Sequence, residues 1–286
     1  MNEMKHTAFF LVFAVLASAL TGCKTEYEIL LEGNDIDAKY AAAFDYFNQG
    51  KYSRSAQLFE SLSAQTNGMA LDDTVQYYWG LSNYKYKDYY TAETNFSNFV
   101  VNYPKSPFAQ EAYFYRIDCM YRSTYRYELD QKPTNLAIAA ISEYLTDFTD
   151  SPHRERCMEM LDDLGERLDR KAFENARLYY KMEDYKAAAV ALRNVLKDDS
   201  ENMYREDILY YIAMSSYKYA FMSVPEKQKE RYLAFVDDYL NFIGEYEESD
   251  YRRELDGLYR RVQKLLGKYP VALASDVVEA DDNAGE

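Results

Sequence analysis

Residues able to carry out chemistry are scarce in this chain of 286 residues. Its two histidines and three cysteines are His6, His153, Cys23, Cys119 and Cys157. A zinc site needs roughly four such ligands that converge, and a nucleophilic triad needs a histidine beside its serine or cysteine. No two cysteines form a C-x-x-C pair, and the ten glycines include no glycine-rich phosphate loop. The sequence therefore predicts neither an enzyme nor a metal or cofactor site, and leaves open only an enzyme that uses carboxylates alone.

Cys23 is the one cysteine whose surroundings indicate a reaction. The chain begins with a short segment containing Lys5, continues with the apolar run Ala8–Leu20, and reaches Cys23 through Thr21 and Gly22. A basic start, an apolar stretch and small residues before the cleavage point are the parts of a secretory signal. The 13 residues of the apolar run are too few to cross a hydrocarbon core of about 30 Å as a helix.

The segment Leu-Thr-Gly-Cys resembles the lipobox of bacterial lipoproteins, in which the cysteine becomes the acylated first residue of the processed chain. The resemblance implies that residues 1–22 are removed as a signal peptide and that Cys23 carries palmitate and diacylglyceryl chains. Several acyl chains, at ~0.8 kcal/mol per buried CH₂, would hold the protein on a membrane almost permanently. The alternative is an ordinary signal peptide followed by an unmodified cysteine.

The charge of the chain excludes one class of partner. Its 48 acidic and 33 basic residues give a net charge of −15 at pH 7. Such a surface repels nucleic acids and anionic lipid headgroups. We therefore expect no nucleic-acid partner, and we expect contact with a membrane to come through the lipid anchor.

The rest of the sequence is helical in pattern. Between Ile36 and Leu266, apolar residues recur at spacings of three and four, and no segment alternates with the period of a strand. Prolines fall at the breaks between these stretches, at Pro104, Pro107, Pro133, Pro152 and Pro225. We expect a lipidated tether over 23–35, a solenoid over 36–267 and an acidic, disordered tail over 268–286.

One pattern of paired helices recurs along the chain. The second helix of each pair carries a large anchor, and these anchors lie 37, 45, 51 and 47 residues apart, at Phe59, Phe96, Ile141, Leu192 and Tyr239. In three copies the first helix carries a small residue, then an aromatic four positions later, then a tight turn that ends in Tyr. The small residues are Ala43, Gly80 and Ala176. The pattern resembles the tetratricopeptide repeat. We therefore expect an all-α fold, a right-handed solenoid of about five tetratricopeptide-like helix hairpins.

The first helices of such a solenoid line its concave face. In tetratricopeptide proteins the groove-facing positions flank the small residue, which predicts a candidate peptide groove at Tyr40, Phe44, Phe47, Tyr77, Leu81 and Tyr84. Rigid aromatic rings bury a large area at low entropic cost, so this groove would suit an extended peptide with aromatic side chains. The same rings could instead only pack the helices together, and the sequence leaves both readings open.

Together the lipobox, the tether, the five hairpins and the junction over 102–107 resemble the BamD family, lipoproteins of the outer-membrane β-barrel assembly machinery. The resemblance implies a scaffold without a cofactor, anchored to the outer membrane and facing the periplasm. It implies as partners the periplasmic domains of the barrel insertase, other lipoproteins of the machinery, and unfolded outer-membrane proteins. The later repeats would hold the insertase. The acidic tail departs from the family pattern.

Two other functions fit the same features. One is a periplasmic tetratricopeptide coordinator of envelope division or cell-wall synthesis, and the other is a sugar-capture lipoprotein built on the same repeats. Three single residues have plainer explanations. Cys119 and Cys157 lie in predicted helices and are expected to be free, buried thiols, and His153 is expected on the surface in the first turn of a helix.

Overall fold

The computed structural model describes residues 25–268, and every regular element in that range is an α-helix. This confirms the prediction of an all-α fold made of helix hairpins. The predicted signal peptide, Cys23 and the tail beyond residue 268 lie outside the described residues, so their assignments remain predictions.

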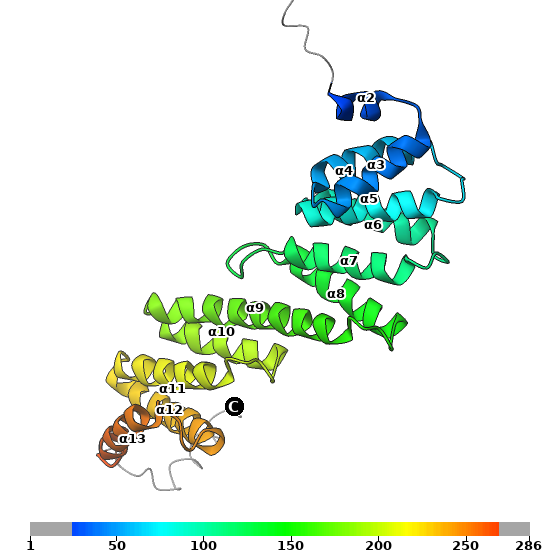
Figure 1. Ribbon diagram of the computed structural model, residues 1–286. Helices are drawn as coiled ribbons and strands as arrows, with labels where there is room; N and C mark the ends of the chain where they lie inside the picture. The colour runs from blue at the N-terminus through cyan, green and yellow to red at the C-terminus, as the bar shows by residue number, and fades with distance from the viewer. Residues whose placement is uncertain (1–24, 269–286) are drawn as a thin grey trace, which may run out of the picture. The chain divides into compact units, whose positions relative to one another are not determined.

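The helices follow one another with short connections, and neighbours in the sequence pack side by side within each part of the chain (Figure 1). A short helix, α2, precedes the array and α13 follows its last hairpin. In chain order the helices are α2 (Glu26–Glu32), α3 (Ile36–Asn48), α4 (Tyr52–Ser63), α5 (Asp72–Tyr86), α6 (Tyr89–Asn102), α7 (Ala109–Arg122), α8 (Lys132–Asp147), α9 (Arg154–Lys181), α10 (Tyr185–Asp198), α11 (Arg205–Phe221), α12 (Pro225–Glu245) and α13 (Arg252–Leu266).

The described chain divides into two compact units. Residues 25–124 and 132–158 form the first unit, and residues 125–131 and 159–268 form the second. The long inserted loop after α7 therefore belongs to the second unit. There the Lys171 ammonium donates to the backbone carbonyls of Tyr127 at 3.1 Å and Leu129 at 2.6 Å, and Arg170 lies 4.4 Å from the centre of the Tyr127 ring.

Part of the predicted tether forms a docked helix. Thr25 caps α2 through a reciprocal bond with Glu28, and the Tyr27 hydroxyl donates to the Gln57 side chain of α4 at 2.6 Å. Lys39 is only 1% exposed, and its ammonium donates to the Leu31 carbonyl at the end of α2 at 3.1 Å. Burial lowers the pKa of Lys39. Because a buried ammonium is stabilised by hydrogen bonds, Lys39 ties α2 to the first hairpin.

Three hairpins turn through the same backbone conformation. Gly50, Lys87 and Glu183 occupy equivalent places before the second helix, with φ of 73°, 70° and 62°. Glycine adopts this left-handed region without the Cβ clash that lysine and glutamate suffer there. The next residue caps the following helix in two of the turns, where Asp88 accepts from the Thr91 amide and Asp184 from the Ala187 amide. The recurrence of one turn confirms the repeat register read from the sequence.

Each hairpin is closed by its buried anchor. Phe59, Phe96, Ile141 and Leu192 have no exposed surface, and Tyr239 is 6% exposed. The small residues Ala43 and Ala176 on the first helices are also buried.

Gly80 shows how tight the contact between a small residue and its anchor is. A Cβ atom on Gly80 would lie 2.9 Å from Cε1 of Phe96, whose ring stacks on Tyr115 with centroids 5.5 Å apart.

Gly80→Ala should destabilise the protein by about 1–3 kcal/mol, because the buried Phe96 ring has no room to move away from the added methyl group. Gly165→Ala in α9 is the matched control, since no atom lies within 4 Å of its new Cβ, and it should stabilise by about 0.5–1 kcal/mol. Thermal melts followed by circular dichroism measure both. A Gly80→Ala variant as stable as wild type would show that the two helices are not in close contact.

Hydrogen bonds from tyrosine hydroxyls to carboxylates join different helices of the same unit. Tyr103 donates to Asp72 at 2.8 Å and Tyr84 to Asp118 at 2.8 Å in the first unit. In the second unit three more such bonds, at 2.6–2.9 Å, join Tyr210 to Glu254, Tyr239 to Asp256 and Tyr251 to Asp207. A hydrogen bond to a charged acceptor is stronger than one between neutral groups, so these five tyrosine–carboxylate pairs contribute to holding the helices together.

These bonds make stability sensitive to alkaline pH. Burial, reinforced by the bonded carboxylate, raises the pKa of Tyr103 and of Tyr239 to about 12, above the ordinary value of about 10. Below pH ~10 both the folded and unfolded states keep these phenols neutral. Between pH ~10 and ~12 only the unfolded state loses the proton, so the free energy of unfolding should fall as pH rises through that window.

Urea denaturation across this pH range should show a shallower loss of stability in a Tyr103→Phe, Tyr239→Phe double variant than in wild type, although the variant starts less stable at neutral pH. Equal slopes for the two proteins would mean that other groups cause the alkaline loss.

Candidate partner-binding surfaces

The six predicted groove residues lie on α3 and α5, and the structure gives their rings packing partners. Phe44 contacts Phe59 and Tyr78, with ring centroids 5.1 and 4.6 Å apart. Tyr77 stacks on Phe108 with centroids at 4.5 Å. These contacts are those expected if the rings hold helices together.

Exposure separates the six residues into two groups. Tyr77 and Leu81 are 7% and 8% exposed, so they offer almost no surface to a peptide. Four side chains are half-buried and keep some accessible area: Tyr40, Phe44, Phe47 and Tyr84. Tyr84 is also held in place, because its hydroxyl donates to Asp118. A peptide on this face would contact those four residues, and its binding there remains a prediction.

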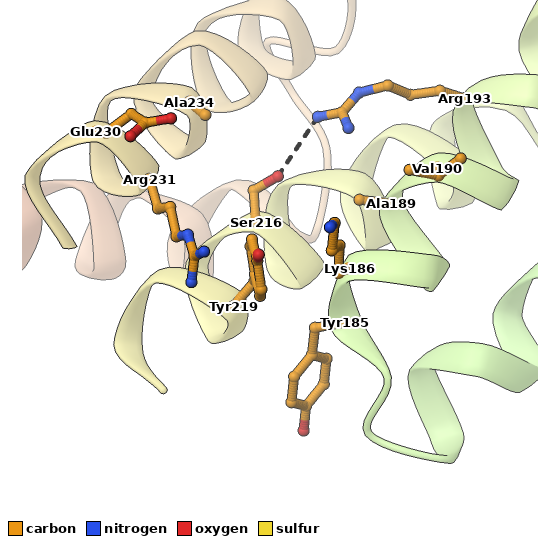
Figure 2. Close-up of a pocket in the computed structure, with 10 residues that line it drawn as sticks. All are labelled: Tyr185, Lys186, Ala189, Val190, Arg193, Ser216, Tyr219, Glu230, Arg231 and Ala234. Atoms are coloured by element: carbon orange, nitrogen blue, oxygen red, sulfur yellow. Dashed lines mark hydrogen bonds between the residues drawn. The ribbon is translucent and has the colours of Figure 1, made fainter. Parts of the chain in front are cut away.

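The second unit contains a hollow of about 410 Å³ that sequence reasoning did not identify. Figure 2 shows that α10, α11 and α12 each supply part of its lining. Ala189, Val190 and Ala234 form the apolar part, with the rings of Tyr185 and Tyr219 beside them. Val190 is 52% exposed, so this apolar part is open to solvent.

Cations lie around this apolar floor. The Arg193 guanidinium donates to both carboxylate oxygens of Asp238 at 2.7 and 2.8 Å, so that pair is neutral. Arg231 lies 4.0 Å from the centre of the Tyr219 ring and donates to the Ser223 hydroxyl. Within the described residues neither Arg231 nor Lys186 forms an ion pair with a carboxylate. The hollow therefore offers an apolar floor, two cations without a carboxylate partner among the described residues, and the Glu230 carboxylate, which pairs with Lys227.

A second hollow of about 420 Å³ continues this surface past Tyr185, Lys186, Tyr219 and Arg231. Met182 and Met222 line it, with 66% and 62% of their surfaces exposed. Phe221 and Val224, next to Met222 in sequence, are each 60% exposed. Exposed apolar side chains that gather in one place mark interaction surfaces, and methionine adapts its shape to a partner. We call the two hollows together the α10–α12 surface.

The sequence holds a weak signal for this surface. Met182 directly precedes the left-handed turn residue Glu183, and Met222 ends α11, where a solvated loop would ordinarily carry polar residues. The spacing of apolar residues along one helix does not predict that Met182, at the end of α9, and Met222, at the end of α11, line the same hollow.

The rare residues with reactive side chains belong to the first unit and do not line this surface. Cys119 and Cys157 are free, with no exposed surface, as expected from the sequence. His153 is not the surface residue that the sequence suggested, because its ring stacks on Phe114 with centroids 3.7 Å apart and its side chain is 24% exposed. Across residues 25–268 no group of three or more His, Cys, Asp or Glu side chains could hold a metal ion.

Both thiols should resist modification while the protein is folded. Burial raises the pKa of Cys157 to about 11 and that of Cys119 further still, so neither is a thiolate at neutral pH. In a Cys23→Ser chain, a disulfide reagent at pH ~8 should label neither residue before unfolding and both residues in urea. Rapid labelling of the folded chain would contradict the buried placement.

An array of helix hairpins with an exposed apolar surface is the architecture of a protein-binding scaffold. None of its described helices is both long enough and apolar enough to span a membrane. Residues 34–233, which are 200 of the 286, match the family model described as YfiO, outer membrane lipoprotein. The chain therefore belongs to the YfiO family of outer membrane lipoproteins.

Individual relatives are more distant. The chain is 19% identical over 199 residues to outer membrane protein assembly factor BamD of Caulobacter vibrioides, a match that covers 68% of this chain and 65% of that protein. It thus spans less than two thirds of the length of that relative. Among solved structures, a TPR repeats protein from Bacteroides fragilis is similar at 15% identity with a TM-score of 0.39, over 82% of this chain and 100% of that one.

Proposed function

We propose that this protein is a lipid-anchored scaffold of the outer-membrane β-barrel assembly machinery. Membership of the YfiO family supports the outer-membrane assignment, and the similarity to an assembly factor supports the assembly role. In this proposal acylated Cys23 holds the chain on the periplasmic face of the membrane. The helical units bind proteins and catalyse no reaction.

The α10–α12 surface carries the proposal. Val190, Met182 and Met222 leave apolar area open to solvent, which is costly unless a partner covers it. Lys186 and Arg231 beside them would recognise carboxylates on that partner. We assign this surface to the periplasmic domains of the barrel insertase.

The first unit would serve the unfolded substrates of the machinery. Tyr40, Phe44, Phe47 and Tyr84 are half-buried rings on the first helices of two adjacent hairpins. Aromatic side chains at the end of an unfolded barrel protein could add to this set of edge and face contacts, each worth about 0.5–1.5 kcal/mol. Because these rings already pack on other aromatic residues of the fold, substrate binding and fold stability share the same side chains.

Insertase binding through the α10–α12 surface predicts a specific loss. Replacing Val190 and Met222 together by Asp should lower the amount of insertase that co-purifies in mild detergent by roughly 10-fold or more, because two central apolar contacts are lost. The matched control is Val101→Asp with Leu136→Asp, two apolar positions in the first unit that are 76% and 54% exposed. It should leave insertase recovery unchanged.

Circular dichroism of both double variants checks that they are folded. Recovery of division proteins or glycan with the wild-type chain, and no insertase, would reject the assembly role. Equal insertase recovery with all three chains would keep that role but reject this surface as its docking site.

A further inference from the structure

Four basic side chains gather at the turn end of the first two hairpins. A hollow of about 450 Å³ is lined by the turn before α4 and the turn before α6, and its cations are Lys51, Arg54, Lys85 and Lys87. All four are exposed, and within the described residues none forms an ion pair with a carboxylate. We call this the basic turn surface. In a chain with a net charge of −15 such a local excess of positive charge is the exception.

The start of the described chain lies against this same surface. Arg54 lies 5.1 Å from the centre of the Tyr27 ring, and the Tyr27 hydroxyl donates to the Arg54 backbone carbonyl at 3.2 Å. Cys23 precedes Thr25, the cap of α2, by two residues. The predicted anchor therefore adjoins in sequence the helix whose Tyr27 contacts Arg54.

Exposed tyrosines accompany the cations. Tyr86 lines the hollow and is 57% exposed, and Tyr90, three residues beyond Lys87, is 81% exposed. Tyrosine is favoured at the boundary between a membrane and water, because its ring enters the apolar region while its hydroxyl stays solvated. Lysine and arginine on the same surface attract anionic headgroups at close range, even when the rest of the protein repels them.

We propose that the basic turn surface binds the anionic phospholipid headgroups of the membrane beside the anchor. The inference deepens the proposed function and rests on Cys23 being the acylated residue. The contact would give the first unit a defined orientation on the membrane, which a flexible lipid anchor by itself does not. The net negative charge of the chain predicts repulsion from anionic lipid, and the basic turn surface would be an exception to it. Salt screens repulsion between exposed charges more than about 8–10 Å apart, so the four basic side chains determine the local interaction.

The test uses the full processed chain with Cys23→Ser, so that no acyl group contributes to binding. Its flotation with vesicles of phosphatidylglycerol and phosphatidylcholine is compared with flotation on phosphatidylcholine alone. We expect binding only to the anionic vesicles and weakening with added salt. Lys85→Glu with Lys87→Glu should reduce that binding by roughly 10-fold or more, since both changes reverse a charge at the surface.

Lys105→Glu with Lys197→Glu is the matched control, because it makes the same change in net charge at exposed positions outside the hollow. The proposal holds if this control binds as the parent chain does. It is overturned if the parent does not float with anionic vesicles, floats equally with neutral ones, or loses binding equally in both double variants. Membrane fractionation of wild type against Cys23→Ser tests the anchor separately, so a failed lipid contact and a failed anchor give different results.

Discussion

The close approach of paired helices is the constraint on which the rest of this structure depends. Gly80 lies so near Phe96 that a single added carbon would meet the ring at 2.9 Å. With the two helices this close, the aromatic residue four positions after the small one packs on the tyrosine that begins the second helix, as Tyr84 does on Tyr89 with centroids 5.7 Å apart. Dispersion between rings, weak for any one atom pair, then adds up over the whole hairpin.

Five tyrosines and five carboxylates have a common role in this packing. A tyrosine places its ring in the interface between helices and its hydroxyl at the edge, where it can donate to a carboxylate of another helix. Tyr103 with Asp72 and Tyr251 with Asp207 do so at 2.8 and 2.6 Å. Each of these two carboxylates is thereby hydrogen-bonded without a cationic partner. Such bonds matter in a chain whose 48 acidic residues outnumber its 33 basic ones.

Surfaces left over from this packing are the ones available for function. Neighbouring hairpins bury the faces of the helices, whereas the turns and helix ends stay accessible. Both proposed contact surfaces include turns or helix ends. The α10–α12 surface combines exposed methionines with Lys186 and Arg231, which suits a protein partner. The basic turn surface combines Lys85 and Lys87 with an exposed tyrosine, which suits a membrane.

Sequence alone determined the helices, the repeat register and the buried anchors. All three depend on residues close together in the sequence. Within one helix pair the sequence shows a small residue, an aromatic residue four positions later, and a turn that ends in Tyr. The tertiary structure decided which rings are covered, since burial depends on the neighbouring hairpin. Tyr77 is therefore buried while Tyr84 keeps accessible surface. It also placed Lys51 and Lys85 around one hollow and Val190 and Tyr219 around another. Such pairs are far apart in sequence, and only the packing of one hairpin on the next brings them together.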